Sequence, residues 1–362
     1  MAKSRRKSLF KKSLLIYTII ATILCVTFVI YIFVTLKTYE KNQTTTFIKA
    51  SIAKLDDDTL KGYLKDNNQN ENLLDEYKKQ INDKDIKIIK KDENNFEVEL
   101  NERILFDVET KYLKTETKLG MFSYELRDIT KITPHLERGL IYYDITVPST
   151  YEINIDGKKA ENPVKKEKYK NLDYMYQNDS MPYIVTYEVN NLTKEVDIKA
   201  TNEYGKEVSL KKNKFAYKAE KNYLSFDTYD EAKKYLSSEV DIWDFAHKWS
   251  LFLTNDLSGL SHGYNTIKTY FIDGTEMNRR AYNWAHNIDI MFTSRHTLKN
   301  PPFTNEKLSN FTIYSKNAFS CEVYLDKHMI VNGKEQIDTM HDYIYFINDN
   351  NTWKVVNIKA GE

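Results

Sequence analysis

The longest apolar run of the chain lies near its start. Residues 13–36 hold 24 residues without a charge, and Lys37 follows directly. A helix of this length spans roughly 36 Å at about 1.5 Å per residue, which is enough to cross a hydrocarbon core of about 30 Å. A cleaved signal peptide is the alternative, but its apolar core would be only about 7 to 15 residues long. The run therefore predicts an uncleaved transmembrane helix over residues 13–36.

The next part of the chain changes its apolar period once. Over residues 37–82 apolar positions recur at helical spacing, interrupted by the polar tract 65–72. From Ile86 onward apolar and charged residues alternate, which is typical of half-buried antiparallel strands. Helices followed by strands predict a membrane-proximal α+β domain over residues 37–147. Its strand-like runs are 86–88, 96–100, 104–113, 118–127 and 139–147.

Residues 148–216 alternate without any helical stretch. Asp156-Gly157 lies between two alternating runs and is the strongest short hairpin signal in the chain. This part is predicted to form a small all-β domain, immunoglobulin-like or a variant of a β-sandwich. Residues 162–179 are expected to form a long loop within it.

The last unit, residues 222–362, repeats the helix-then-strand order. Thr228 with Glu231 and Ser238 with Asp241 have capping-box spacing, which predicts two helix starts. Residues 260–271 predict a further short helix, and the last four strands are expected at 311–314, 319–325, 341–347 and 353–358. Two helices have clear buried faces, made of Ile242, Phe245, Trp249 and Phe252 in one, and of Met277, Ala281, Trp284, Ile288 and Met291 in the other.

In the NTF2-like cone fold, helices come first in the chain and pack on a curved antiparallel sheet that follows them. The last unit resembles this fold. The whole order of units resembles the teicoplanin-resistance-associated family of Gram-positive membrane proteins. The strings that carry this resemblance are Val147-Pro148-Ser149, Ile153-Asn154-Ile155-Asp156-Gly157-Lys158 and Trp353-Lys354-Val355-Val356. It implies a role in the cell envelope, linked to cell-wall integrity or the response to wall-active antibiotics. The family often begins with a cytoplasmic zinc ribbon, whereas no cysteine precedes Cys25 here.

The fold class expected for the chain is α+β. It consists of an N-terminal transmembrane helix, an α+β unit that itself resembles the NTF2-like fold, a small all-β unit, and a C-terminal NTF2-like cone.

Charge on the two sides of the apolar run predicts its orientation. Residues 1–12 hold six basic residues and no acidic one, and they are interpreted as a cytoplasmic tail. Residues 37–362 are then expected outside the cell membrane. They carry 47 basic and 52 acidic residues, so phosphate neutralisation does not favour nucleic-acid binding. The bilayer is the first expected partner, and no nucleic acid is expected.

Cysteine usage narrows the setting further. Cys321 is the only cysteine beyond the apolar run, so the outer part is expected to have no intramolecular disulfide. This suits a surface protein of a Gram-positive bacterium. Cys321 is in phase with Phe319 and Val323, which predicts a small core residue.

The last unit is also where chemistry would be sought, because it holds six of the seven histidines and all four tryptophans. His247 and His286 are expected to point away from the packed helix faces, since each is two residues from a buried tryptophan. Asp289 and His296 are too far apart along a helix to bind one ion. HExxH, CxxC, GxSxG and a glycine-rich phosphate loop are absent, so no catalytic residue, metal or cofactor is predicted.

The candidate ligand or partner face is aromatic. His341, Tyr343 and Tyr345 share one face of their predicted strand, and Tyr324 lies on the polar face of its own. On the concave side of a cone, these residues would line a pocket for a sugar, peptide or partner strand. Ordinary packing of a half-buried sheet is the alternative.

These patterns favour a single-pass, non-catalytic binding or scaffold protein, with a cell-envelope protein or wall component as partner. One alternative is an NTF2-like subunit of a conjugative transfer channel, and neighbouring genes for transfer ATPases would favour it. A second is an enzyme that uses the cone. A closed pocket with His341, or any histidine within about 3 Å of a carboxylate, would favour the enzyme. A third is a structural stalk. The oligomeric state is not predicted.

Overall fold

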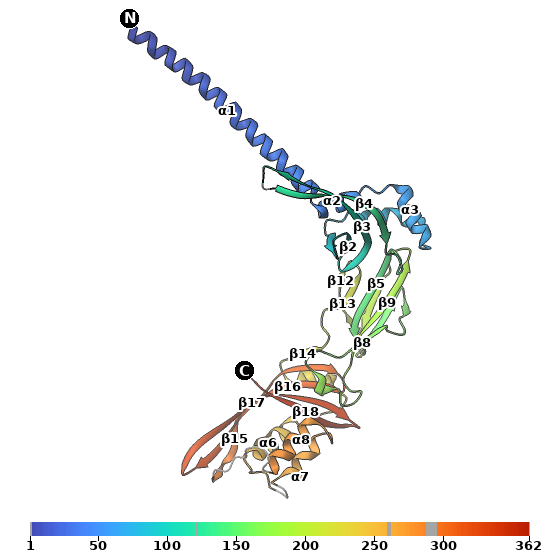
Figure 1. Ribbon diagram of the computed structural model, residues 1–362. Coiled ribbons are helices and arrows are strands. Elements are labelled where there is room, and N and C mark those ends of the chain that lie inside the picture. Colours follow the sequence, from blue (N-terminus) through green and yellow to red (C-terminus); the bar gives the residue numbers. More distant parts are fainter. Residues whose placement is uncertain (1, 121, 259–261, 287–294, 362) are drawn as a thin grey trace. The chain divides into compact units, whose positions relative to one another are not determined.

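The computed structural model describes residues 2–120, 122–258, 262–286 and 295–361 (Figure 1). The chain divides into two compact units, which are described separately. The first contains Met1–Tyr142 and Asn190–Glu195, and the second contains Tyr143–Val189 and Val196–Glu362. Mixed helices and sheets follow one N-terminal helix, so the predicted α+β fold class is confirmed.

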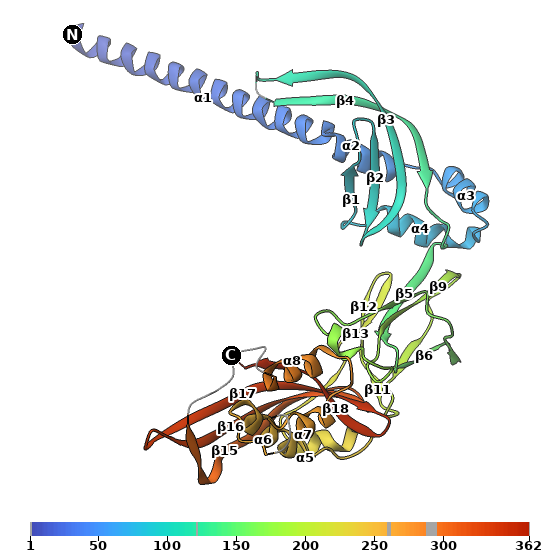
Figure 2. The same ribbon diagram turned by 60° about the horizontal axis from the view of Figure 1, so that its bottom comes forward.

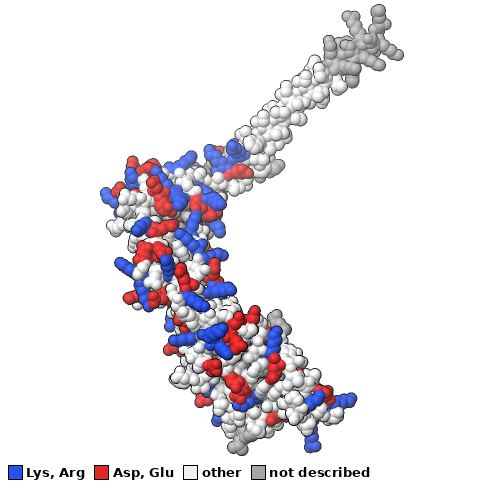
Figure 3. Space-filling model, turned by 180° about the vertical axis from the view of Figure 1, so that it is seen from behind, with Lys and Arg blue, Asp and Glu red and all other residues white. Residues whose placement is uncertain are grey.

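The N-terminal helix α1 (Ala2–Asn42) is the only described helix long and apolar enough to cross a membrane. Its candidate span is Leu14–Asn42, with a mean hydropathy of 2.7 over its most apolar window. Apolar side chains along this span, such as Phe28 and Val29, are exposed. Figure 3 shows the middle of α1 as uncharged, while side chains of both signs are interspersed over the rest of that face. The predicted helix is therefore present, and its orientation stays a prediction.

The first unit continues with short helices and one antiparallel sheet of order β1-β2-β3-β4. Asp56 begins one helix by accepting a hydrogen bond from the backbone N–H of Thr59 at 2.7 Å. Ile48, Leu60 and Tyr77 are buried, as their helical spacing indicates. The elements are α2 (Thr44–Ile52), α3 (Asp57–Asp66), η1 (Glu71–Leu73), α4 (Leu74–Ile81), β1 (Lys87–Lys90), β2 (Asn95–Leu100), β3 (Arg103–Lys118) and β4 (Phe122–Pro134).

The all-β domain contains two sheets, of order β11-β10-β6-β7 and β12-β13-β5-β9-β8. Ile145 and Val185 from one sheet and Ile153 and Ala200 from the other share one buried core, which makes the domain a sandwich. The elements are β5 (Ile141–Pro148), β6 (Glu152–Ile155), β7 (Lys158–Lys159), β8 (Lys165–Glu167), η2 (Asp173–Met175), β9 (Ile184–Leu192), β10 (Ile198–Thr201), β11 (Glu207–Val208), β12 (Leu210–Asn213) and β13 (Ala216–Ala219).

Strand β5 differs from the sequence interpretation, which placed residues 139–147 in the first α+β domain. It pairs with β13 in parallel and lies beside β9, so it belongs to the sandwich. Alternation identifies a strand but does not name its partner, because every half-buried strand has the same period of two.

The C-terminal domain has the predicted order of helices followed by an antiparallel sheet, of order β14-β15-β16-β17-β18. Figure 2 shows α5 to α8 gathered beside the long curved strands. The elements are β14 (Leu224–Phe226), α5 (Tyr229–Ala232), η3 (Lys233–Tyr235), α6 (Ile242–Leu253), α7 (Tyr264–Ile267), η4 (Lys268–Tyr270), α8 (Glu276–Ala285), β15 (His296–Ser315), β16 (Ala318–Val331), β17 (Lys334–Asp349) and β18 (Thr352–Ala360).

Helix starts and ends in this domain correct some expectations. Helix α6 is capped by Asp241, whose carboxylate accepts from the N–H of Asp244, and not by Ser238. Asp241 is itself a good cap, so a capping box read from spacing alone begins this helix three residues too early. Helix α8 ends at Ala285, and Ile288 and Met291 lie outside the described residues.

One face of the C-terminal sheet packs on the helices. Cys321 and Ile344 are fully buried there together with Trp249 of α6 and Ala281 of α8. The predicted buried faces of both helices are therefore confirmed over their described lengths except at Trp284, which is half-buried, and the core position of Cys321 is confirmed. At the centre, the rings of Phe319 and Phe346 stack with their centroids 4.7 Å apart.

The other face of the same sheet is covered in part by the sandwich. Met175 of η2 and the nearby Met181 are buried together with Ala318, Ile347 and Val356 of the sheet. The segment that carries η2 is the one expected to be a long loop. This segment therefore packs on the C-terminal domain, and the residues in contact form a second, smaller core.

Replacing Phe346 with alanine is expected to lower the free energy of unfolding of the C-terminal domain by about 3–5 kcal/mol, because the change leaves a cavity in its core. Urea unfolding of the full chain in detergent, followed by tryptophan fluorescence, measures this change, since all four tryptophans lie in that domain. Ile337→Ala is the control on the same strand. Its side chain is 51% exposed, so a change within about 0.5 kcal/mol is expected.

Candidate functional site

The predicted aromatic face lies on the side of the sheet that points away from the helices. Val323 and Leu325 of β16 and Ile344 of β17 contact the helical layer. Side chains alternate along a strand, so Tyr324 and Tyr343 project from the opposite face. These residues therefore do not face the helical layer. Alternation shows which residues share a face, but not which face the helices cover.

The structure divides the four predicted residues into two places. Tyr324 and His341 are cross-strand partners with ring centroids 5.8 Å apart. Tyr345 lies farther along β17 and is covered by Tyr174 of η2, at a centroid distance of 5.0 Å. Tyr343 is half-buried between these two positions. Tyr345 is therefore packed as in an ordinary half-buried sheet, which is the alternative to a ligand face.

His341 is held by its neighbours, and it lines none of the four cavities that stand out among the described residues. Its Nε2 lies 2.5 Å from Oε1 of Glu322, and Oε2 of the same carboxylate accepts hydrogen bonds from Ser309 and Asn310. These hydrogen bonds, with the one to His341 first, hold the pKa of Glu322 below its ordinary value. A side chain at Gly361 would come within 2.6 Å of the His341 ring, so the end of β18 closes over it.

Other histidines also lie next to carboxylates. His296 Nε2 is 2.9 Å from Asp256, and His328 Nδ1 is 2.8 Å from Glu335. His247 pairs with Glu306 and is half-buried against Phe303, while His286 is exposed as expected. By distance alone these pairs favour the enzyme alternative. Four cavities stand out in the described part of the chain, however, and no histidine lines any of them.

Lys327 forms the most buried polar cluster of the domain. Its side chain is fully buried, and its Nζ donates to the carbonyl of Ser250 and to Oγ1 of Thr254, both at 2.7 Å. Asp338 pairs with it at 3.0 Å. Burial lowers the pKa of Lys327, and the hydrogen bond and charge of Asp338 oppose that effect. Thr254 continues the cluster by donating to Asp256. None of the four cavities reaches this lysine.

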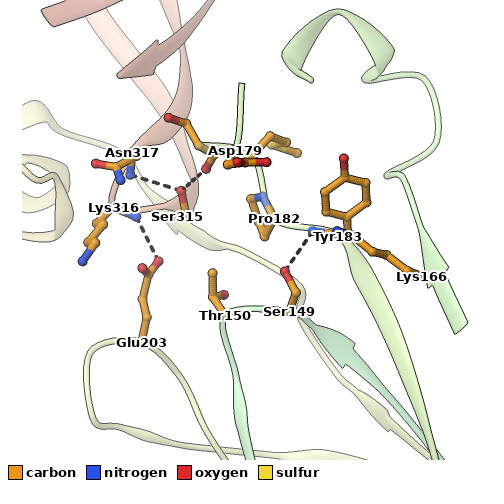
Figure 4. A pocket seen from close by; sticks show the side chains of 12 residues that line it. Ser149, Thr150, Lys166, Asp179, Pro182, Tyr183, Glu203, Ser315, Lys316 and Asn317 are labelled. Atoms are coloured by element: carbon orange, nitrogen blue, oxygen red, sulfur yellow. Dashed lines mark hydrogen bonds between the residues drawn. The ribbon is translucent and has the colours of Figure 1, made fainter. Parts of the chain in front are cut away.

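One cavity lies where the sandwich meets the C-terminal domain (Figure 4). It has a volume of about 340 Å³. Glu203 accepts a hydrogen bond from the backbone N–H of Lys316, and Ser315 donates to the carbonyl of Ser180. Burial raises the pKa of Glu203. These polar groups bond the two domains to each other, so we interpret this cavity as part of their contact.

A second cavity opens between α6, α8, the middle of β17 and the end of β18, and has a volume of about 490 Å³. This size is in the range of small-molecule sites. The apolar lining comes from the helices and β18, and two of its members are indole rings. Its lining residues are Trp249, Leu253, Met277, Arg280, Trp284, Asp342, Ile358 and Ala360. We refer to this cavity as the cone-mouth pocket.

Two polar groups make the cone-mouth pocket unusual. Asp342 is half-buried among apolar side chains, and this burial raises the pKa of its carboxyl group. The indole nitrogen of Trp284 is buried and has no hydrogen-bond partner among the described residues. Unpaired buried donors are costly and uncommon in proteins. The pocket therefore combines aromatic area with a carboxyl group, and the Arg280 guanidinium lies at its exposed edge.

Sequence reasoning placed Trp249, Met277 and Trp284 in the core, and the first two are buried there. Trp284 is only half-buried, because a stripe at helical spacing does not show where the stripe stops being covered. The sequence did contain a pattern that could have identified Asp342 as a site residue. It is in phase with Ile344 and Phe346, so it is an acidic residue on the apolar face of its strand. Such a residue marks a place where the core ends or a ligand is recognised.

Comparisons with known proteins add little to this geometry. No family model matches the chain, and no curated protein does. A solved structure described as "Ntf2 like protein involved in plasmid conjugation" is similar over 81% of this chain and 83% of that chain. It has 10% sequence identity and a TM-score of 0.22, and a likeness of this size carries no argument about function.

The raised pKa of Asp342 predicts a pH dependence of stability. The folded domain holds this proton more tightly than the unfolded chain, so Asp342 lowers the stability as the pH rises from about 3.8 through the raised pKa. Asp342→Asn removes this effect. We expect its urea midpoint, read by tryptophan fluorescence, to exceed that of the wild type at pH 7 and to approach it at pH 4. Asp227→Asn, at an exposed site, is the matched control, and equal pH profiles for all three proteins would refute the assignment.

Proposed function

We propose that this chain is a single-pass membrane-anchored protein whose extracytoplasmic domains bind a component of the bacterial cell envelope without transforming it. The cone-mouth pocket is the observation that carries the proposal. An aromatic pocket with one carboxyl group suits a ligand that has an apolar face and hydrogen-bonding groups, such as a sugar ring. The apolar helix α1 would keep this pocket within reach of the membrane.

Two further observations support a binding role over a catalytic one. The His341–Glu322 and His296–Asp256 pairs lie outside the four cavities, and of the His247–Glu306 pair only the carboxylate lines one of them. General acid–base catalysis requires such a pair within reach of a bound substrate. The cone-mouth pocket offers Asp342 and Arg280 but lacks a nucleophile paired with a base among its lining residues. The resemblance to the teicoplanin-resistance-associated family points in the same direction, toward a role at the cell wall.

Binding is tested by titrating the full chain, in detergent, with purified glycan-peptide fragments of Gram-positive cell wall. We expect a saturable change in tryptophan fluorescence. Trp284→Ala should weaken binding roughly tenfold, because one aromatic wall is lost, and Asp342→Asn should weaken it by a smaller factor while keeping the shape of the pocket. Tyr282→Ala is the control, because Tyr282 lies on the same helix, is 44% exposed and does not line the pocket.

The same samples separate binding from catalysis. The mass of each recovered fragment should be unchanged after long incubation with the wild-type chain. Cleavage or modification of a fragment would contradict the non-catalytic part of the proposal. The absence of any saturable signal, or equal affinities for the wild type and both pocket variants, would contradict the assignment of the pocket.

A further inference from the structure

The β3–β4 hairpin of the first unit lies beside the transmembrane helix. In Figures 1 and 2 its tip runs along α1 and points toward the N-terminal side of that helix. The ring of Tyr39 on α1 contacts Phe122 and Tyr124 of β4, with centroid distances of 5.4 and 6.3 Å. This contact fixes the level at which the hairpin meets α1.

The hairpin extends beyond that level. Phe122 is paired with Lys118, so the turn at Leu119 begins one residue, or about 3.3 Å, beyond the level of Phe122. Along a helix this corresponds to about two residues, and the Tyr39 side chain itself leans toward the N-terminus of α1, so the tip lies at about the level of Leu36. The burial of α1 agrees with this estimate, because Thr35 is 7% exposed and Ile32 is half-buried, while Phe33 between them is 64% exposed.

This level is the outer end of the uncharged segment, which ends at Leu36. A segment of roughly 36 Å exceeds a hydrocarbon core of about 30 Å, so its outer end lies among the lipid headgroups. The tip of the hairpin would then reach the boundary between headgroups and acyl chains, if α1 crosses a bilayer as proposed above.

The tip carries a residue that the turn does not favour. Leu119 and Gly120 have φ angles of +51° and +69°, a left-handed conformation that favours glycine, asparagine and aspartate. The other non-glycine residues with positive φ in the described chain are polar, and most are asparagine. Leu119 is 37% exposed, so its side chain is not explained by packing in a core.

The residues beside the tip are suited to lipid headgroups. Lys114 and Lys118 lie 2.8 and 3.5 Å from Glu116, which leaves one net positive charge in this group. The hydrogen bonds from Lys114 and Tyr124 hold the pKa of Glu116 down at about 2, so the carboxylate keeps its charge. Amphipathic lysines flanking an apolar residue are typical of membrane-interface contacts.

We propose that the tip of the β3–β4 hairpin, with Leu119 at its apex, inserts into the outer lipid surface next to α1. Leu119 enters the boundary of the acyl chains, and Lys118 lies at the level of the phosphates. The hairpin then fixes the orientation of the first domain relative to the bilayer, which a single helix does not do.

The test uses the full chain, with Cys25→Ala, in vesicles of phosphatidylcholine and phosphatidylglycerol. A single cysteine, Leu119→Cys, is labelled with an environment-sensitive fluorophore, and Cys321 is fully buried and stays unlabelled. We expect quenching by nitroxide lipids, and several-fold weaker quenching by aqueous iodide than at Thr130→Cys, an exposed site farther along the same hairpin. Equal iodide quenching at both sites, without quenching by nitroxide lipids, would overturn the proposal.

A second variant tests the loss of the apolar side chain without disturbing the turn. Leu119→Asn suits the positive φ, so the hairpin should remain intact while its apolar apex is lost. With the fluorophore at Thr117→Cys, we expect iodide quenching to rise at least twofold when Leu119 is replaced by Asn. No rise would contradict insertion through Leu119. Retention of the chain in vesicles after a high-pH wash tests the anchor by itself, so a failure of α1 to span the bilayer is distinguished from a failure of the hairpin to insert.

Discussion

The C-terminal domain depends on a sheet that is buried on both faces. Helices α6 and α8 cover one face, around Cys321 and Ile344, and the η2 segment of the sandwich covers part of the other, around Ala318 and Ile347. A sheet that is covered on both faces needs apolar side chains on both faces of its strands, and β16 and β17 provide them. The loop of the sandwich is therefore part of the core of its neighbour, and the two domains form one compact unit.

This arrangement decides where a ligand can bind. The outer face of the sheet is occupied at Tyr345 by Tyr174, and His341 is closed over by the end of β18. On the face that the helices cover, Phe319 of β16 and Phe346 of β17 fill the centre. The cone-mouth pocket lies where the helical cover ends, and there Asp342 interrupts an otherwise apolar face. The proposed binding site therefore lies at the edge of a filled core.

Much of the fold follows from the sequence, because each feature involved is local. The apolar run predicts α1, and helical or alternating spacing predicts the buried faces of α6, α8, β16 and β17. The features that were not predicted depend on contacts between distant segments. Neither the pairing of β5 with β13 nor the packing of Met175 on the C-terminal sheet leaves a local pattern. For the same reason, the sequence identified an aromatic face but not the side on which it lies. Asp342 and Leu119 are exceptions, since each departs from the residue type that its position favours.

The most direct test of this account is the unfolding of the C-terminal domain after a change in the sandwich. Met175 is fully buried and belongs to η2, whereas all four tryptophans lie in the C-terminal domain. If η2 completes the core of that domain, Met175→Ala lowers its free energy of unfolding, measured by tryptophan fluorescence in urea, by about 2–5 kcal/mol. Val164→Ala, at a site 60% exposed in the same connection, should leave it unchanged. An unfolding curve for Met175→Ala that coincides with the wild type would contradict the shared core.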